Sequence, residues 1–246
     1  MHSSVRLLYA LFLLLGLAST GWGQSTAPHA ITFSAGYSIP IGKFASKQFN
    51  DPNAGLAGSG YFGQLSYEQR FNSWLGARLS GSLNINETNP DPIIEQYSIL
   101  LPNRDTYTWQ KDVTQWKFGS VLAGPAVFLR MGPIILEGHV QVGVAFARSP
   151  SLSVIGTSST GNFPVEARVA QANSKALGLG AGGSIRVPIT ERLHFQITGS
   201  WIGSNMYFKD VPTYAFVGDV GPIESLQSRR RYIGVLNAGA GLAFNF

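Results

Sequence analysis

The sequence predicts an all-β protein, an eight-stranded antiparallel up-and-down transmembrane β-barrel. Apolar residues alternate with small or polar residues in eight segments, which is the period of a strand with two different faces. After the N-terminal region, no apolar run is long enough to form a membrane helix. Short and long connections alternate between the eight segments, as they do in barrels that cross a membrane.

The composition is compatible with one large all-β domain. The chain has 246 residues, of which 44% are hydrophobic and 13% are charged. It contains no cysteine, which excludes disulfides and thiolate metal sites and suits an oxidising compartment. The formal net charge is +5, but the basic residues are dispersed except at 229–231, so we expect no nucleic-acid partner.

The first residues have the parts of a secretory signal peptide. Arg6 precedes an apolar run that ends at Ala18, and Gly21 and Gly23 stand three and one residues before a cleavage site at Gln24. The alternative is an uncleaved membrane anchor, which needs ~20 apolar residues, more than this run supplies. The expected parts are a signal peptide at 1–23, a short segment at 24–30 and a barrel domain at 31–246.

The first three strands alternate clearly. Their apolar faces are Ile31, Phe33, Ala35, Tyr37 and Ile39 in residues 30–39; Tyr61, Leu65 and Tyr67 in residues 60–70; and Leu75, Ala77, Leu79, Leu83 and Ile85 in residues 75–85. The opposite faces carry serine, threonine, glutamine and glycine with few charges. Each segment therefore has one face for an apolar environment and one for a polar environment.

The fourth strand, from about Thr114 to Leu129, is less regular. We place Trp116 and Phe118 on its apolar, outward face, and we expect Gly124 and Pro125 to form a bulge.

The last four strands alternate again. Their apolar faces are Leu136, Val140, Val142, Val144 and Phe146; Leu177, Leu179, Ala181, Ile185 and Val187; Leu193, Phe195, Ile197 and Trp201; and Tyr232, Leu236, Ala240, Leu242, Phe244 and Phe246. The expected tight turns lie at 71–74, 131–133 and 188–192, and the expected long loops at 40–59, 86–112, 148–173 and 203–228.

The polar faces indicate that the apolar faces meet lipid. A soluble barrel would carry many lysine and glutamate residues outside, whereas these polar faces suit a narrow, filled lumen. Aromatic residues near the strand ends form two expected girdles. One girdle is Tyr67, Trp74, Phe128, Phe195 and Phe246, and the other is Tyr37, Trp116, Phe146, Trp201 and Tyr232.

The chain resembles the small eight-stranded outer-membrane proteins of Gram-negative bacteria, a class that includes the transmembrane domain of outer membrane protein A. The resemblance covers residues 31–246 by pattern, and its most specific part is the spacing of Gly241, Phe244 and Phe246. It implies an integral outer-membrane location, contact with outer-membrane lipid and lipopolysaccharide, and an assembly signal read by the barrel assembly machinery. The family usually has a polar residue three positions before that glycine, where this chain has Ala238. The residues around Gln24 resemble those of Bacteroidota.

Seven charged or histidine side chains are expected to face the lumen toward the short-turn end. They are Glu68, Arg70, Arg78, Glu137, His139, Arg186 and His194. The turn at 71–74 makes two strands neighbours, so Glu68 and Arg78 should lie opposite each other. We interpret the set as a structural plug of ion pairs and hydrogen bonds, with a proton or ion path as the alternative.

The sequence gives little support to enzymatic or metal chemistry. A serine hydrolase of the outer rim would need a histidine base there, and none lies in the long loops. Glu137 and His139 have no third metal ligand nearby in the sequence. We therefore expect no catalytic residues, no cofactor and no bound metal.

The expected function is non-enzymatic surface binding or envelope integrity, because long loops on a rigid scaffold are where binding usually occurs. The expected partner is an extracellular protein or glycan, and the second long loop is the candidate site through Leu100, Arg104, Tyr107 and Trp109. These residues could instead only extend the flanking strands as a hairpin. Arg229, Arg230 and Arg231 are expected to be solvated charges, with lipopolysaccharide phosphates as the alternative contact. The rival functions are transport of a small apolar ligand and an accessory role in secretion.

Overall fold

The computed structural model describes residues 29–48, 51, 53–101, 106–159, 164–218 and 220–246. The expected signal peptide and Arg104 lie outside these residues. Within them, no helix is long and apolar enough to cross a membrane.

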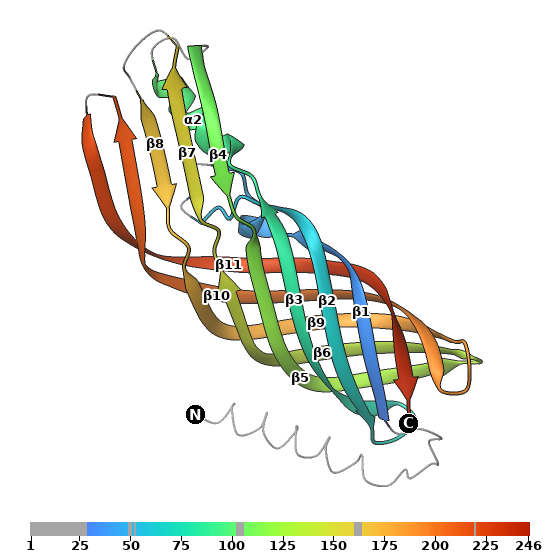
Figure 1. The fold of residues 1–246 in the computed structure, drawn as a ribbon. Helices are drawn as coiled ribbons and strands as arrows, with labels where there is room; N and C mark the ends of the chain where they lie inside the picture. Colours follow the sequence, from blue (N-terminus) through green and yellow to red (C-terminus); the bar gives the residue numbers. More distant parts are fainter. Residues whose placement is uncertain (1–28, 49–50, 52, 102–105, 160–163, 219) are drawn as a thin grey trace, which may run out of the picture.

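Eight long antiparallel strands form a closed barrel (Figure 1). They are β1 (His29–Pro40), β2 (Ala57–Arg70), β3 (Leu75–Thr88), β5 (Trp116–Met131), β6 (Ile134–Arg148), β9 (Asn173–Pro188), β10 (Leu193–Val217) and β11 (Val220–Asn245). Each strand pairs with the next, and β11 pairs with both β10 and β1, which closes the circle. The predicted eight-stranded up-and-down barrel is confirmed.

The connections at one end are tight, as predicted. Between β5 and β6 only Gly132 and Pro133 separate the paired residues Met131 and Ile134. Gly132 has a φ of 61°, a conformation that glycine adopts without steric cost and that matches the twist of a hairpin.

The connections at the other end are folded, which corrects the expectation of four long loops. The first contains a 3-10 turn, η2 (Gly42–Phe44), and the second contains α2 (Asp91–Leu100) and β4 (Tyr107–Val113). The third contains β7 (Leu152–Ser158) and β8 (Val165–Val169), whereas the fourth is a continuation of β10 and β11 as a hairpin.

These folded connections build a second sheet beyond the barrel. Its strand order is β11–β10–β8–β7–β4, and α2 lies beside it, at the upper left of Figure 1. The same two strands, β10 and β11, thus belong to the barrel wall and to this outer sheet. We call it the outer sheet below.

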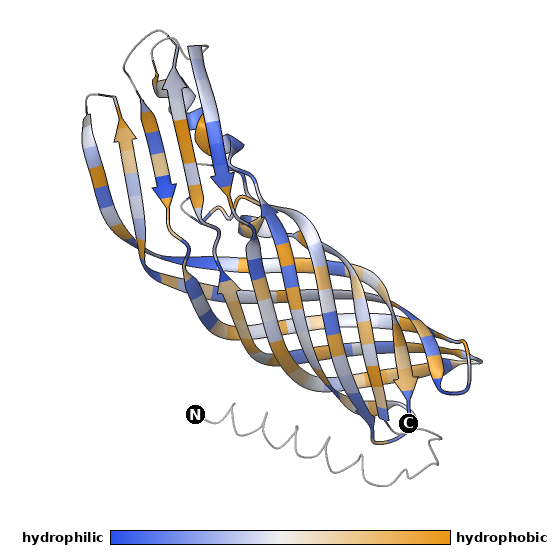
Figure 2. Cartoon of the chain, viewed as in Figure 1, coloured by the Kyte–Doolittle hydropathy of each residue, from blue (hydrophilic) through white to orange (hydrophobic). Residues whose placement is uncertain are grey.

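The outside of the barrel is an apolar band. Its exposed side chains include Ile31, Phe33, Leu65, Leu79, Leu83, Val121, Val127, Val140, Val142, Val144, Leu177, Leu179, Ile185, Ile197, Leu236, Leu242 and Phe244. The band is visible as orange segments on every barrel strand in Figure 2. Exposed aromatic residues lie toward the two ends, among them Tyr37, Tyr61 and Tyr232 at one end and Trp74, Phe195 and Phe246 at the other.

The facing of β5 differs from the prediction. Trp116, Phe118 and Phe128 are buried inside the barrel, while Val121 and Val127 are about half exposed outside. The two aromatic residues Trp116 and Phe128 therefore do not belong to the girdles. The predicted facing was wrong because both faces of β5 carry apolar residues, so a period of two does not distinguish the inner face from the outer face.

The expected bulge at Gly124 and Pro125 is also absent from the pairing of β5. Ala123 pairs with Val142 before these residues and Ala126 pairs with His139 after them, so the register is unchanged. Pro125 still lacks a backbone donor, and it lies opposite Ala77 of β3 in an uninterrupted ladder.

The lumen is filled in two layers. Toward the tight turns it holds buried charged and polar side chains, and toward the outer sheet it holds an apolar cluster around Trp116, Phe118, Met206 and Ile233. Phe44 of η2 enters this cluster, is fully buried and meets the Trp116 ring edge-on at a centroid distance of 5.2 Å. Ser38, Asn84 and Asn86 are also buried beside this cluster, so the expected hydrophilic lumen is interrupted there by apolar side chains.

Candidate functional site

Two glutamates and two arginines form an ion-pair ring in the polar half of the lumen. Glu68 comes from β2, Arg78 from β3, Glu137 from β6 and Arg186 from β9. Inward-facing positions on four different strands bring these side chains together across the barrel axis. All four side chains are at most 1% exposed.

Each arginine in the ring contacts both glutamates. Arg78 Nη1 donates to Glu68 Oε1 at 2.9 Å and to Glu137 Oε1 at 2.6 Å. Arg186 Nη2 donates to Glu137 Oε2 at 2.8 Å and also to Glu68 Oε1. Glu68 and Arg78 are directly paired across β2 and β3, as the sequence predicted.

Neighbouring polar groups support this ring. Ser184 Oγ donates to Glu137 Oε2 at 2.7 Å, and Arg186 Nε donates to Gln196 Oε1 at 2.9 Å. His139 Nδ1 lies 3.0 Å from Glu137 Oε1. The alternating charges and these hydrogen bonds offset part of the cost of burying ions. Gln196 and Ser184 are participants that the sequence argument did not single out, although both lie on the expected polar faces.

The other two residues of the expected set lie beside the ring. Arg70 stacks over the ring of Phe128 with its guanidinium carbon 4.7 Å from the ring centroid. His194 Nδ1 lies 2.9 Å from the side-chain amide of Asn245. Five of the seven residues thus form one network, and two lie at its border.

The side chains of this network fill the lumen and balance one another's charges. Within the described part of the chain, no three histidine, aspartate or glutamate side chains gather in a way that could hold a metal ion. Between the ion-pair ring and the outer sheet, the apolar cluster closes the lumen.

We expect the purified protein to show no large, stable conductance in planar lipid bilayers, because ions would have to cross both the ion-pair ring and the apolar cluster. Single-channel recording tests this expectation. Current steps of the size of a general porin would contradict it.

The outer-sheet residues from the second connection are only partly available. Tyr107 and Trp109 lie on β4, are half-buried and stack on each other at a centroid distance of 6.0 Å. Trp109 covers Gly156 of β7, where an added Cβ would lie 2.8 Å from its ring. Leu100 ends α2. Because β4 pairs with β7 and not with β3, the hairpin alternative for this segment is wrong.

The three consecutive arginines have different surroundings. Arg230 is exposed, but Arg229 and Arg231 line a cavity at the mouth of the barrel. The guanidinium carbon of Arg231 lies 5.5 Å from the centroid of the Trp116 ring. The expectation of ordinary solvated charges is therefore wrong for Arg231. The sequence did not predict the contact between Arg231 and Trp116, because the alternation indicated that Trp116 faces the outside of the barrel.

The expected assembly-signal residues lie on β11 and just after it. Phe244 and Phe246 are about half exposed on the outside, and their rings stack at 6.3 Å. Gly241 lies against β1, where an added Cβ would be 2.1 Å from the carbonyl oxygen of Phe33. Recognition by the assembly machinery remains a prediction.

The wall of the barrel has the inverse polarity of a soluble protein. Charged side chains are buried in the lumen, whereas the large side chains exposed in the middle of the strands are valine, leucine, isoleucine and phenylalanine. Such an apolar band with aromatic ends, an even number of strands and tight turns at one end describes barrels of the outer membrane. The protein is an outer-membrane β-barrel in its fold.

Matches to known proteins are found among solved structures. No protein-family model matches the sequence, and no curated protein matches it. The structure is similar to Ail, the attachment invasion locus protein of Yersinia pestis, with 15% identity, a TM-score of 0.41 and coverage of 89% of this chain and 99% of that chain. It is also similar to Neisserial surface protein A, with 10% identity, a TM-score of 0.47 and coverage of 89% and 98%.

A third similar structure is a major outer membrane protein from Thermus thermophilus, with 14% identity and a TM-score of 0.40. It covers 89% of this chain and 99% of that chain. The barrel of eight paired strands is the fold that the resemblance in the sequence implied. These similar structures give no support to the expected Bacteroidota origin.

Proposed function

We propose that the chain is a non-enzymatic surface receptor of the outer membrane that binds an extracellular protein through the outer sheet. The observation that carries this proposal is the open edge formed by residues 220–228 of β11. Among the described residues, this segment pairs with β10 alone, so its other side has unpaired backbone groups.

The open edge also carries exposed apolar side chains. Ile223 is 60% exposed and Leu226 is 69% exposed, whereas Glu224 is the one acidic residue between them. An extended segment of another protein can add to such an edge through backbone hydrogen bonds, with apolar side chains giving additional contact. The rigid barrel holds this edge away from the membrane, and β10 and β11 continue into it as strands, with a register shift between Phe208 and Val211 (Figure 1).

The outer sheet also moves the proposed binding site from the second long loop to the open edge of β11. Tyr107 and Trp109 are half-buried within the sheet, so they support its structure, whereas Ile223 and Leu226 are available at its surface. The buried ring and apolar cluster give no support to transport through the lumen. The proposal therefore favours binding over transport.

Cells that display the intact protein should bind at least one protein from a panel of labelled extracellular proteins, in a saturable manner. The double change Ile223→Asp and Leu226→Asp should weaken this binding at least tenfold, because it places charge on the apolar contact without changing the barrel wall. Binding is measured by flow cytometry at matched surface levels.

The matched control is Ile189→Asp, since Ile189 is equally exposed at 57% but lies in a tight turn at the other end of the barrel. It should leave binding unchanged. Unchanged binding of the double variant would remove the open edge from the proposal. Saturable binding to glycans alone, or to no component of the panel, would contradict a protein receptor.

A further inference from the structure

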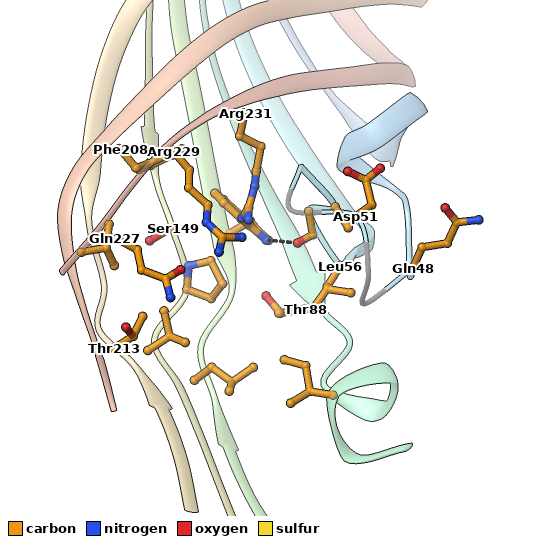
Figure 3. Close-up of a pocket in the computed structure, with 18 residues that line it drawn as sticks. Gln48, Asp51, Leu56, Thr88, Ser149, Phe208, Thr213, Gln227, Arg229 and Arg231 are labelled. Atoms are coloured by element: carbon orange, nitrogen blue, oxygen red, sulfur yellow. Dashed lines mark hydrogen bonds between the residues drawn. The ribbon is translucent and has the colours of Figure 1, made fainter. Parts of the chain in front are cut away.

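A cavity of about 230 Å³ lies where the barrel meets the outer sheet. Its walls come from the connection after β1, the ends of β3 and β5, and the upper parts of β10 and β11 (Figure 3). Segments far apart in the sequence thus enclose one space at the mouth of the barrel. The apolar cluster of the lumen forms its floor through Trp116 and Phe208, whose rings meet at a centroid distance of 5.9 Å.

Most of the cavity lining is apolar. Besides the two aromatic rings it includes Leu56, Ile93, Leu152, Val169 and Val211. Leu56 has a φ of 53°, an uncommon conformation for a bulky residue, and hydrogen bonds with Ser46 and Asn89 hold its backbone. The Trp116 ring is likewise fixed, because its Nε1 donates to the Gly55 carbonyl at 2.9 Å.

Two arginines add positive charge to this apolar space. Figure 3 shows the side chains of Arg229 and Arg231 extending from β11 into the same cavity. Arg231 is partly buried over Trp116, and its Nε has no hydrogen-bond partner among the described residues. A buried donor without a partner is unfavourable, more so when it is charged, so an anion that accepts a hydrogen bond from it would be stabilised.

The nearby carboxylate of Asp51 compensates this charge only in part, since it attracts Arg231 electrostatically but forms no ion pair with it among the described residues. Asp51 lies in the cavity wall, but it forms an ion pair with Lys43, and that hydrogen bond holds the pKa of Asp51 below its usual value. The described residues place no carboxylate within 4 Å of the Arg231 guanidinium. The mouth of the barrel therefore combines an apolar pocket with the incompletely compensated charge of Arg231.

We propose that this cavity binds an amphiphilic anion, a carboxylate or phosphate joined to a short hydrocarbon chain. Arg231 and Arg229 bind the anionic head, and the chain lies against Trp116, Phe208 and Leu56. A volume of about 230 Å³ is below the roughly 300–1,000 Å³ of pockets for larger ligands, so it selects a short chain. Because the floor is closed by packed side chains, the cavity holds the ligand and does not pass it into the lumen.

The test uses the full-length protein in lipid nanodiscs and 8-bromo-octanoate as the probe, since bromine quenches nearby tryptophan fluorescence. We expect saturable quenching that disappears in Trp116→Phe. Arg231→Gln should weaken binding about tenfold, because a hydrogen bond to a charged group is lost. Arg231→Lys, which keeps the charge, should bind within a few-fold of the original protein.

Three comparisons separate this proposal from simple partitioning into lipid. Arg192→Gln removes an exposed arginine at the tight-turn end and should leave quenching unchanged. 8-Bromo-octanol, which lacks the charge, should bind at least tenfold more weakly than 8-bromo-octanoate. Octyl phosphate and octanoate compete in separate experiments, and the stronger competitor identifies the preferred head group.

Equal quenching by the acid and the alcohol would overturn the proposal. So would unchanged binding in Arg231→Gln, or full quenching in Trp116→Phe. Each variant is first checked for the folded barrel by its heat-dependent electrophoretic mobility. If Arg231→Gln does not fold, the comparison of acid with alcohol in the original protein decides the proposal alone.

Discussion

Replacing Glu137 with leucine should lower the free energy of unfolding by about 3–5 kcal/mol. Glu137 accepts hydrogen bonds from Arg78, Arg186 and Ser184, and its side chain is fully buried. Its removal leaves two guanidinium groups to share Glu68 inside the barrel. Equilibrium urea unfolding in phospholipid vesicles, followed by tryptophan fluorescence, measures the change.

A charge-balanced variant distinguishes electrostatics from lost packing. Arg78→Met combined with Glu137→Leu leaves the Glu68–Arg186 pair intact and removes one charge of each sign. This double variant should be less destabilised than Glu137→Leu alone, because no uncompensated ion remains. Glu191→Leu, at an exposed position in a tight turn, should change stability by less than about 0.5 kcal/mol. A double variant less stable than the single variant would contradict the ring as a balanced unit.

Replacing Val142 with arginine should cost about 2–4 kcal/mol, the usual cost of an arginine that faces lipid near the middle of the bilayer. Val142 lies in the middle of β6, pairs with Leu179 and Ala123, and is 50% exposed on the apolar band. The same unfolding experiment in vesicles measures this cost.

The matched control for Val142 is a residue on the same outer surface at a different depth in the bilayer. Val187 is 43% exposed on the same outer surface but lies next to the end of β9, so Val187→Arg should cost only about 0–1 kcal/mol. Equal costs at the two positions would contradict a lipid-facing band. Gln141→Arg is a weaker comparison, because Gln141 is buried and its Nε2 donates to the carbonyls of Arg78 and Leu122.

The strands with different faces were predictable from the sequence. In β1, β2, β6 and β9 the apolar set meets lipid and the polar set meets the lumen, so residue type reports facing directly. This alternation was sufficient to predict the number of barrel strands, the tight turns and the Glu68–Arg78 pairing, but not the three further strands of the outer sheet. It also placed all seven charged or histidine residues of the expected lumen set in buried positions.

The local sequence pattern did not predict which side chains fill the lumen at the mouth of the barrel. Trp116 and Phe118 were misplaced because β5 is apolar on both faces, and the lumen there is filled by apolar side chains from several strands and from η2. Their environment depends on residues distant in sequence, such as Phe44, Met206 and Ile233, which only the closed barrel brings together.

The outer sheet has the same origin in long-range contact. Nothing local to residues 203–228 distinguishes a loop from the extended hairpin of β10 and β11, whose strands are stabilised by pairing with each other and with β8. The sequence by itself thus determined the barrel, since strand facing follows from the contrast between lipid and lumen. Only the tertiary structure decided the outer sheet, its open edge and the arginine-lined cavity, because each depends on strand pairing and packing between distant segments.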